Sequence, residues 1–157
     1  MASKLAAAKL AAWTGVRTVI ADASRPGVLA DAVTGVAGVG TVIRPHERRL
    51  PARKLWIAFA VASSGAVVVD AGAAQAVSSG TASLLAAGVV GVEGAFTAGD
   101  AVEVVGPDGV VAKGLTTHAA ETVAAIAGRR ADDLDSGIDP CVIHVDDLVV
   151  VPPETVA

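Results

Sequence analysis

Two short apolar segments near the start of the chain limit what this sequence can fold into. Residues 16–21 and 39–43 are largely apolar on both faces, a pattern typical of strands inside a parallel sheet that helices cover. Such a sheet needs several strands, and only these two precede a change of pattern. We therefore interpret residues 1–44 as the C-terminal remnant of a larger α/β domain. In the isolated chain the apolar strand faces would be exposed, which predicts aggregation or dimerisation.

Helix signals surround these two segments. A helix is predicted from about Ser3 to Gly15, because glycine suits a C-terminal stop. A shorter helix is expected over residues 26–35, since proline at its first turn fits the helical backbone angle. Residues 45–51 are polar and flanked by prolines, which indicates a linker.

Beyond the linker the pattern predicts a second domain over residues 52–150, followed by a tail at 151–157. Residues 101–105 and 110–115 are rich in valine and flank a Gly-Pro-Asp-Gly turn that suits a tight reversal. Other strands are predicted at 66–69, 89–92 and 142–150, and helices at 71–78 and 119–127, while 53–59 fits either a helix or a strand. The fold class is therefore α+β: the α/β remnant, then a small β-barrel of mixed type.

Composition argues against a membrane or secreted protein. The longest uncharged stretch lies between Asp70 and Glu93 and is interrupted by glutamine, serine, threonine and glycine, so it does not resemble a spanning helix. Lys4 and Lys9 break up the alanine run at the N-terminus, which does not fit a signal peptide. Cys141 is the only cysteine, which excludes internal disulfides and multi-cysteine metal sites. We expect a cytoplasmic location.

Charge is distributed unevenly along the chain, whose formal net charge is −4. Five basic residues and one acidic residue lie between Arg44 and Lys54, whereas residues 131–157 contain seven acidic residues and no lysine or arginine. Both runs fit solvated surface or linker. A sharper hypothesis takes the basic run as a contact to phosphate or nucleic acid.

Several motifs match one family in order and with matching spacing. Met1-Ala2-Ser3-Lys4-Leu5-Ala6-Ala7-Ala8 resembles the second half of the GTGGMxTKxxAA motif of glutamate 5-kinase. Leu50-Pro51-Ala52-Arg53-Lys54-Leu55-Trp56-Ile57-Ala58 is similar to the family's segment leading into its C-terminal PUA domain. Further similar segments lie at 22–29, 69–73, 83–89, 96–102, 126–129 and 144–149. Met1 falls where the family motif has an internal methionine; a misassigned start codon, a truncated gene and a deliberately expressed piece all remain open.

This resemblance implies an enzyme that transfers the γ-phosphoryl group of ATP, with Mg²⁺, to L-glutamate on the route to proline. It implies that Met1, Ala2, Ser3 and Lys4 bind ATP phosphate, with Ser3 replacing the family's usual threonine. The glutamate site, a second phosphate lysine and the catalytic aspartate would belong to the preceding part of the domain. We therefore expect no complete catalytic set in this chain, no catalysis by the chain alone, and a homo-oligomer for the complete enzyme.

The PUA resemblance provides an alternative, a stand-alone RNA-binding or regulatory module. Arg48, Arg49, Arg53 and Lys54 would then contact the nucleic acid backbone. The chain lacks tyrosine and contains only four aromatic residues, which disfavours base stacking. In addition, His118-Ala119 replaces the family's Tyr-Ser, and Glu121-Thr122-Val123-Ala124-Ala125 replaces its arginine-rich helix. A structural or regulatory role within the kinase oligomer is favoured over RNA binding.

Other conspicuous residues have structural interpretations. His144 and Asp146 would share one face of a strand, but two ligands without a third do not make a metal site, and we expect none. Asp100, after a glycine, is predicted to be a turn residue. Cys141 is predicted to be a small buried apolar group. Because large rings are scarce, Trp13 and Trp56 are expected to anchor the cores of the two domains.

Overall fold

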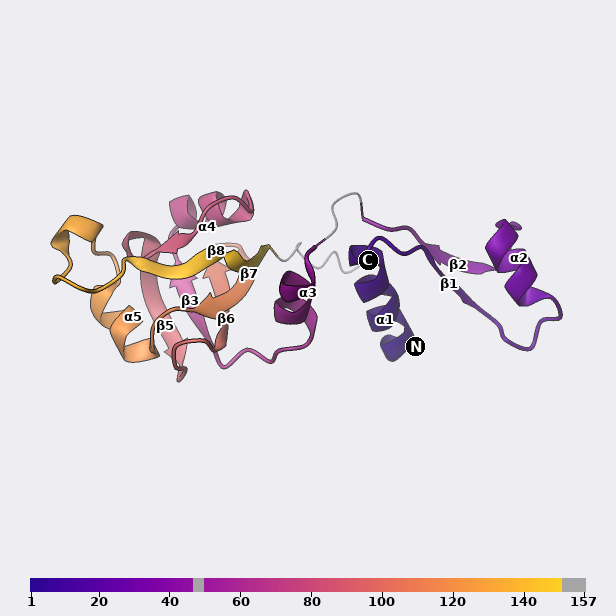
Figure 1. The fold of residues 1–157 in the computed structure, drawn as a ribbon, viewed down its shortest axis with the longest axis horizontal. Coiled ribbons are helices and arrows are strands. Elements are labelled where there is room, and N and C mark those ends of the chain that lie inside the picture. The colour runs from indigo at the N-terminus through magenta and orange to yellow at the C-terminus, as the bar shows by residue number, and fades with distance from the viewer. Residues whose placement is uncertain (47–49, 151–157) are drawn as a thin grey trace. The chain divides into compact units, whose positions relative to one another are not determined.

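A computed structural model describes residues 1–46 and 50–150. The chain separates into two compact units, Met1–Leu55 and Trp56 onward, which are described individually. Figure 1 shows the helices and strands of both units. Two of the residues predicted to contact nucleic acid, Arg48 and Arg49, lie outside the described residues.

The first unit contains two helices and a pair of strands. Helix α1 spans Ala2–Trp13, strand β1 Thr18–Ala21, helix α2 Val28–Thr34 and strand β2 Gly40–Ile43. All four elements were predicted, but β1 and β2 pair in antiparallel fashion, with Thr18 opposite Ile43, rather than as strands of a parallel sheet. In a parallel unit the connecting helix packs across the sheet. Helix α2 buries none of its residues and lies beyond the end of the strand pair (Figure 1).

Little apolar surface is buried within this first unit. Among its described residues, the buried apolar side chains are Ala8, Ala12 and Val39. Trp13 is half-buried and stacks on the imidazole of His46, with ring centroids 3.8 Å apart. The contribution of Trp13 to packing is therefore a ring stack at the end of α1.

Helix α3, Ala52–Phe59, resolves the ambiguous segment in favour of a helix. Its buried residue is Ile57, which is fully inaccessible to solvent. Trp56 is 51% exposed, so the prediction that it anchors the core of the second domain is wrong. Successive helical positions point about 100° apart, and the helix buries Ile57 instead of its neighbour.

The second unit is built on a curled six-stranded sheet (Figure 1). Its strands are β3 (Gly65–Val69), β4 (Leu84–Leu85), β5 (Val89–Gly94), β6 (Ala101–Gly106), β7 (Gly109–Thr116) and β8 (Cys141–Val150). The order across the sheet is β4-β8-β7-β6-β3-β5, and only β3 and β6 pair in parallel among these strands. Helices α4 (Ala71–Ser78) and α5 (Ala120–Ile126) and the 3-10 turns η1 (Ala86–Gly88) and η2 (Ala131–Asp133) complete the unit. The predicted α+β class is confirmed, and the mixed sheet of this unit is an open half-barrel whose edge strands are β4 and β5.

The core of the second unit lies between the inner face of the sheet and helices α4 and α5. It consists mainly of valine, leucine, isoleucine and alanine: Val67, Val69, Val77, Leu84, Val89, Val102, Val104, Ala112, Val123, Ile126, Val142, Ile143 and Leu148, with Phe96. Small side chains allow close backbone packing. A Cβ on Gly114 would lie 2.5 Å from Ile143 Cγ2, so this position of β7 has room only for hydrogen. No helix among the described residues is long and apolar enough to cross a membrane.

Candidate functional site

The N-terminal end of α1 holds the residues predicted to contact phosphate. The helix begins at Ala2, and the Leu5 amide donates the first helical hydrogen bond, 3.1 Å, to the Met1 carbonyl. No side chain caps this end and no acidic residue occupies the first turn. Unsatisfied amides and the positive end of the helix dipole favour an anion there. Ser3 and Lys4 are both exposed in this turn.

The predicted basic contact surface is described only in part, because Arg48 and Arg49 lie outside the described residues. Arg53 and Lys54 are consecutive in α3, which directs their side chains about 100° apart around the helix. Arg53 is exposed and Lys54 is half-buried. The contact of these residues with nucleic acid stays a prediction.

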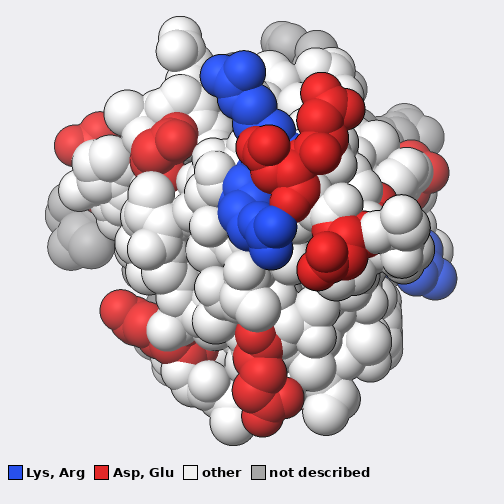
Figure 2. All heavy atoms as spheres, turned by 90° about the vertical axis from the view of Figure 1, so that its left-hand side faces the viewer, with Lys and Arg blue, Asp and Glu red and all other residues white. Residues whose placement is uncertain are grey.

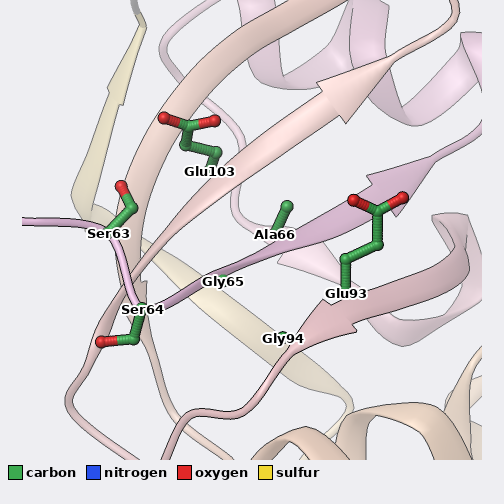
Figure 3. A pocket seen from close by; sticks show the side chains of 7 residues that line it. All are labelled: Ser63, Ser64, Gly65, Ala66, Glu93, Gly94 and Glu103. Carbon is green, nitrogen blue, oxygen red and sulfur yellow. The ribbon is translucent and has the colours of Figure 1, made fainter.

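A shallow pocket, missed by the sequence analysis, lies on the outer face of the sheet in the second unit (Figure 3). Its volume is about 330 Å³, and its lining residues are Ser63, Ser64, Gly65, Ala66, Glu93, Gly94 and Glu103. The strand register explains the arrangement: Ala66 of β3 lies opposite Glu93 of β5 and Glu103 of β6. The small alanine side chain leaves a depression between two carboxylates that project to the same side (Figure 3).

The chemistry of this pocket is acidic. Glu103 lies opposite Lys113 of β7, whose ammonium group donates a hydrogen bond to the Val61 carbonyl. The lining residues supply two carboxylates and two hydroxyls but no imidazole or thiol. Such a lining repels phosphate and provides no nucleophile–base pair. Charged residues inside otherwise apolar strands, Glu93 and Glu103, were the sequence signal that could have located it.

The remaining conspicuous side chains have structural surroundings. His144 Nδ1 lies 3.4 Å from Asp146 Oδ2 on the exposed face of β8, as the strand alternation predicted. The described residues contain no group of three or more side chains suited to hold a metal ion. His118 Nε2 contacts the Asp139 carbonyl at 2.8 Å and so links the segment after β7 to the segment before β8.

Two further predictions meet different outcomes. Asp100 is a turn residue, as predicted: its Oδ2 accepts hydrogen bonds from the Thr97 amide at 2.8 Å and the Thr97 hydroxyl at 3.0 Å. The hydrogen bond from the Thr97 backbone is the main reason that the pKa of Asp100 is lowered. Cys141 is half-buried rather than fully buried, and desolvation raises the pKa of its thiol. The neutral thiol is therefore the favoured form.

The two units differ sharply in charge. Residues 1–55 contain nine lysines or arginines and three acidic residues, whereas residues 56–157 contain three and thirteen. With histidines neutral, the formal charges are +6 and −10. Acidic side chains predominate on the face shown in Figure 2. An anionic ligand is consequently favoured by the first unit and disfavoured by the second.

Comparisons with known proteins give one family match within the second unit and relatives that match almost the whole chain. The PUA domain family matches residues 65–138. Over 154 residues the chain is 44% identical to the glutamate 5-kinase of Mycobacterium tuberculosis, covering 96% of this chain and 39% of that protein. It is 40% identical over 158 residues to the glutamate 5-kinase of Trichlorobacter lovleyi, covering 96% and 41%. The chain thus spans about two fifths of the length of the curated relatives it matches and corresponds to their C-terminal part.

Among solved structures, a crystal structure of a PUA domain from Aeropyrum pernix K1, in complex with tartrate, is similar. It is 31% identical in sequence, with a TM-score of 0.44, and the alignment covers 60% of this chain and 49% of that chain. The identity to the kinases confirms the resemblance that the motifs indicated, and residues 65–138 of the second unit match the PUA domain family.

Proposed function

We propose that this chain is the C-terminal portion of a glutamate 5-kinase, and that the complete enzyme transfers the γ-phosphoryl group of ATP to the side-chain carboxylate of L-glutamate. The observation that carries the proposal is the 44% identity, which extends over 96% of the chain and includes both units. The product would be L-glutamate 5-phosphate, an intermediate in proline biosynthesis. We also propose that the complete enzyme is cytoplasmic and assembles into a homo-oligomer.

Within the complete enzyme, the first turn of α1 would bind ATP phosphate. Its uncapped amides, the exposed Lys4 and the absence of an acidic residue suit an anion, and Met1, Ala2 and Ser3 supply the adjoining backbone. Phosphoryl transfer depends on cations that neutralise charge on the phosphate oxygens, and Mg²⁺ would supply part of that charge. Lys4 would supply another part, from the C-terminal side of the kinase domain.

The domain organisation follows from this proposal. Residues 1–44 form the end of the amino-acid-kinase domain, 45–51 the linker, 52–150 the PUA domain and 151–157 a tail. The pocket of the second unit offers no phosphate-binding cation, and Lys4 alone does not make a catalytic set. Isolated, the chain is therefore expected to lack kinase activity.

A chimera tests the proposed function directly. Residues 1–157 replace the matching C-terminal part of the mycobacterial relative, and ATP-dependent phosphorylation of glutamate is measured. We expect activity, and we expect Lys4→Met to lower kcat/KM by about 100-fold or more because a phosphate-neutralising cation is lost. Lys9→Met, on the same helix, is the matched control and should remain near the parent chimera. An inactive but folded chimera, or equal losses in both variants, contradicts the proposal.

RNA binding by the PUA domain is the second candidate function, favoured only by the family match. The charge of −10 on residues 56–157 disfavours contact with a phosphate backbone. We expect the full chain to produce no mobility shift of a structured RNA at about 50 mM salt. A shift that weakens steeply with added salt and is lost in the Arg53→Ala, Lys54→Ala double variant would instead establish RNA binding.

A further inference from the structure

Helix α2 presents an apolar face that the chain itself does not cover. Leu29 and Val33 stand four positions apart, so they lie on the same side of the helix. Their exposed fractions are 81% and 82%, the highest among the large apolar side chains after that of Met1 in the described part of the chain. We call these two side chains the α2 apolar face. Other exposed apolar residues of the same unit are Leu5, Leu10, Val16, Val36 and Val42.

The first unit is poorly stabilised by its own contacts. Its buried apolar side chains, among the described residues, are two alanines and one valine. Its sheet has only two strands, β1 and β2, and an isolated pair of strands is marginal in water. Exposed apolar surface of this kind marks a site of contact with another polypeptide.

Arg25 connects helix α2, which carries the α2 apolar face, to the segments on either side of it. Arg25 Nη2 makes an ion pair with Asp31 Oδ2 at 3.0 Å, and Arg25 Nη1 donates a 3.2 Å hydrogen bond to the Gly38 carbonyl. Arg25 thus joins the segment before α2, the helix itself and the segment that leads into β2. This pairing also neutralises the charges beside the face, which suits an apolar partner.

We propose that the α2 apolar face docks the kinase segment that precedes the matched region in the glutamate 5-kinases, and that this docking occurs even when the segment is a separate polypeptide. This inference rests on the proposed function. In the mycobacterial relative, the part that matches this chain makes up 39% of the protein. The other three fifths or so of that protein is therefore available to cover the face. A second copy of the first unit is a poorer occupant, because each copy carries a charge of +6.

Co-expression tests this docking. The full chain, carrying an affinity tag, is produced together with the untagged segment of the mycobacterial relative that precedes the matched part. We expect co-purification in a 1:1 ratio, measured by quantitative intact-mass spectrometry. The relative's own C-terminal part, tagged in the same way, sets the recovery expected of a fitted pair.

Single substitutions locate the contact. Leu29→Asp and Val33→Asp should each reduce the recovered segment at least tenfold, because a carboxylate would be buried against an apolar partner. Val90→Asp is the matched control: Val90 is 62% exposed and belongs to the second unit, so recovery should be unchanged. Circular dichroism of each variant alone should match the parent chain, since both α2 residues are exposed.

Each other outcome overturns the docking proposal. Absence of the segment from the purified chain overturns it, as does an equal loss in Val90→Asp. Loss of self-association in Leu29→Asp, with unchanged recovery of the segment, would assign the face to a second copy instead. The chimera separates this proposal from the proposed function, because it joins the two parts covalently. An active chimera without docking in trans refutes only the docking, and docking with an inactive chimera refutes only the kinase function.

Discussion

Asp100 closes the turn between β5 and β6 through its two hydrogen bonds from Thr97. Because these bonds favour the carboxylate, the folded pKa lies below the ordinary value of 3.8. The stabilisation is therefore complete above the unfolded pKa and is lost as pH falls through the lower, folded pKa. We expect Asp100→Ala to lower the melting temperature by a few degrees at pH 7. Melting curves should converge with those of the parent once the pH has fallen below the folded pKa of Asp100.

Exposed Asp135 provides the control for this prediction, since Asp135→Ala removes the same charge from the same unit. Its melting temperature should follow the parent at each pH. A difference between Asp100→Ala and the parent that persists unchanged at low pH would show that the carboxylate is not responsible.

Gly114 and Gly91 form a matched pair of glycines in strands. A Cβ on Gly114 would meet Ile143 Cγ2 at 2.5 Å and the Asp147 carbonyl oxygen at 2.9 Å, whereas one on Gly91 would find its nearest neighbour, Val68 Cβ, at 3.7 Å. Gly114→Ala should lower the free energy of unfolding by about 1–3 kcal/mol through overpacking. Gly91→Ala should be neutral or stabilising by up to about 1 kcal/mol. Urea denaturation measures both, and equal effects would contradict the packing described here.

At the scale of elements, the segment joining α3 to β3 is fastened to the sheet at two points. The Ser64 amide donates to the Ala101 carbonyl at 2.8 Å, and the Lys113 ammonium donates to the Val61 carbonyl. Lys113→Met keeps an apolar stem but removes the donor. Amide hydrogen exchange over residues 61–64 should become about tenfold faster, because a hydrogen bond from a charged group is lost. Arg130→Met, an exposed charge removal in the same unit, should leave this exchange unchanged.

Local signals in the sequence predicted most helices and strands. The features that the sequence did not predict depend on long-range pairing between strands. Helix α4 was predicted with its observed bounds, and Asp70 caps it by accepting from the Ala73 amide at 2.7 Å. The Gly-Pro-Asp-Gly turn likewise joins β6 and β7 as expected. Strand β4 has only two residues, and its pairing with the distant β8 leaves no local pattern. The antiparallel pairing of β1 and β2 was missed for the same reason, because the relative direction of two strands depends on contacts between distant parts of the chain.

The two candidate sites also differ in whether a local or a long-range feature creates them. Lys4 is proposed as a phosphate contact because of a contiguous motif, which a linear sequence displays in full. The acidic pocket arises because the register sets Glu93 and Glu103 on either side of Ala66, across three strands. The sequence displays two glutamates inside apolar strands, but the register that sets them around one depression is three-dimensional information. The exposure of Trp56 was also missed, since ring size alone does not decide which residue of a short helix is buried.

For the whole molecule, the uneven distribution of core residues predicts uneven cooperativity. Unfolding enthalpy near 60 °C is about 0.7 kcal/mol per residue for packed structure. If only the second unit unfolds cooperatively, calorimetry of the chain should give about 70 kcal/mol, whereas 157 cooperatively packed residues would give about 110 kcal/mol. The complex with the kinase segment should raise the value, because the first unit then gains a core. An enthalpy near the larger figure for the chain alone would contradict this division.

The pairing of β4 with β8 also affects how the protein is made. Leu84 is buried, yet its strand has no partner until Cys141–Val150 has been synthesised. At about 5–20 residues per second, the ribosome needs roughly 3–11 s to travel from Leu85 to Cys141. During that interval the nascent chain displays an unpaired apolar strand to chaperones. A nonsense codon anywhere between β4 and β8 would make that exposure permanent and send the product to proteolysis.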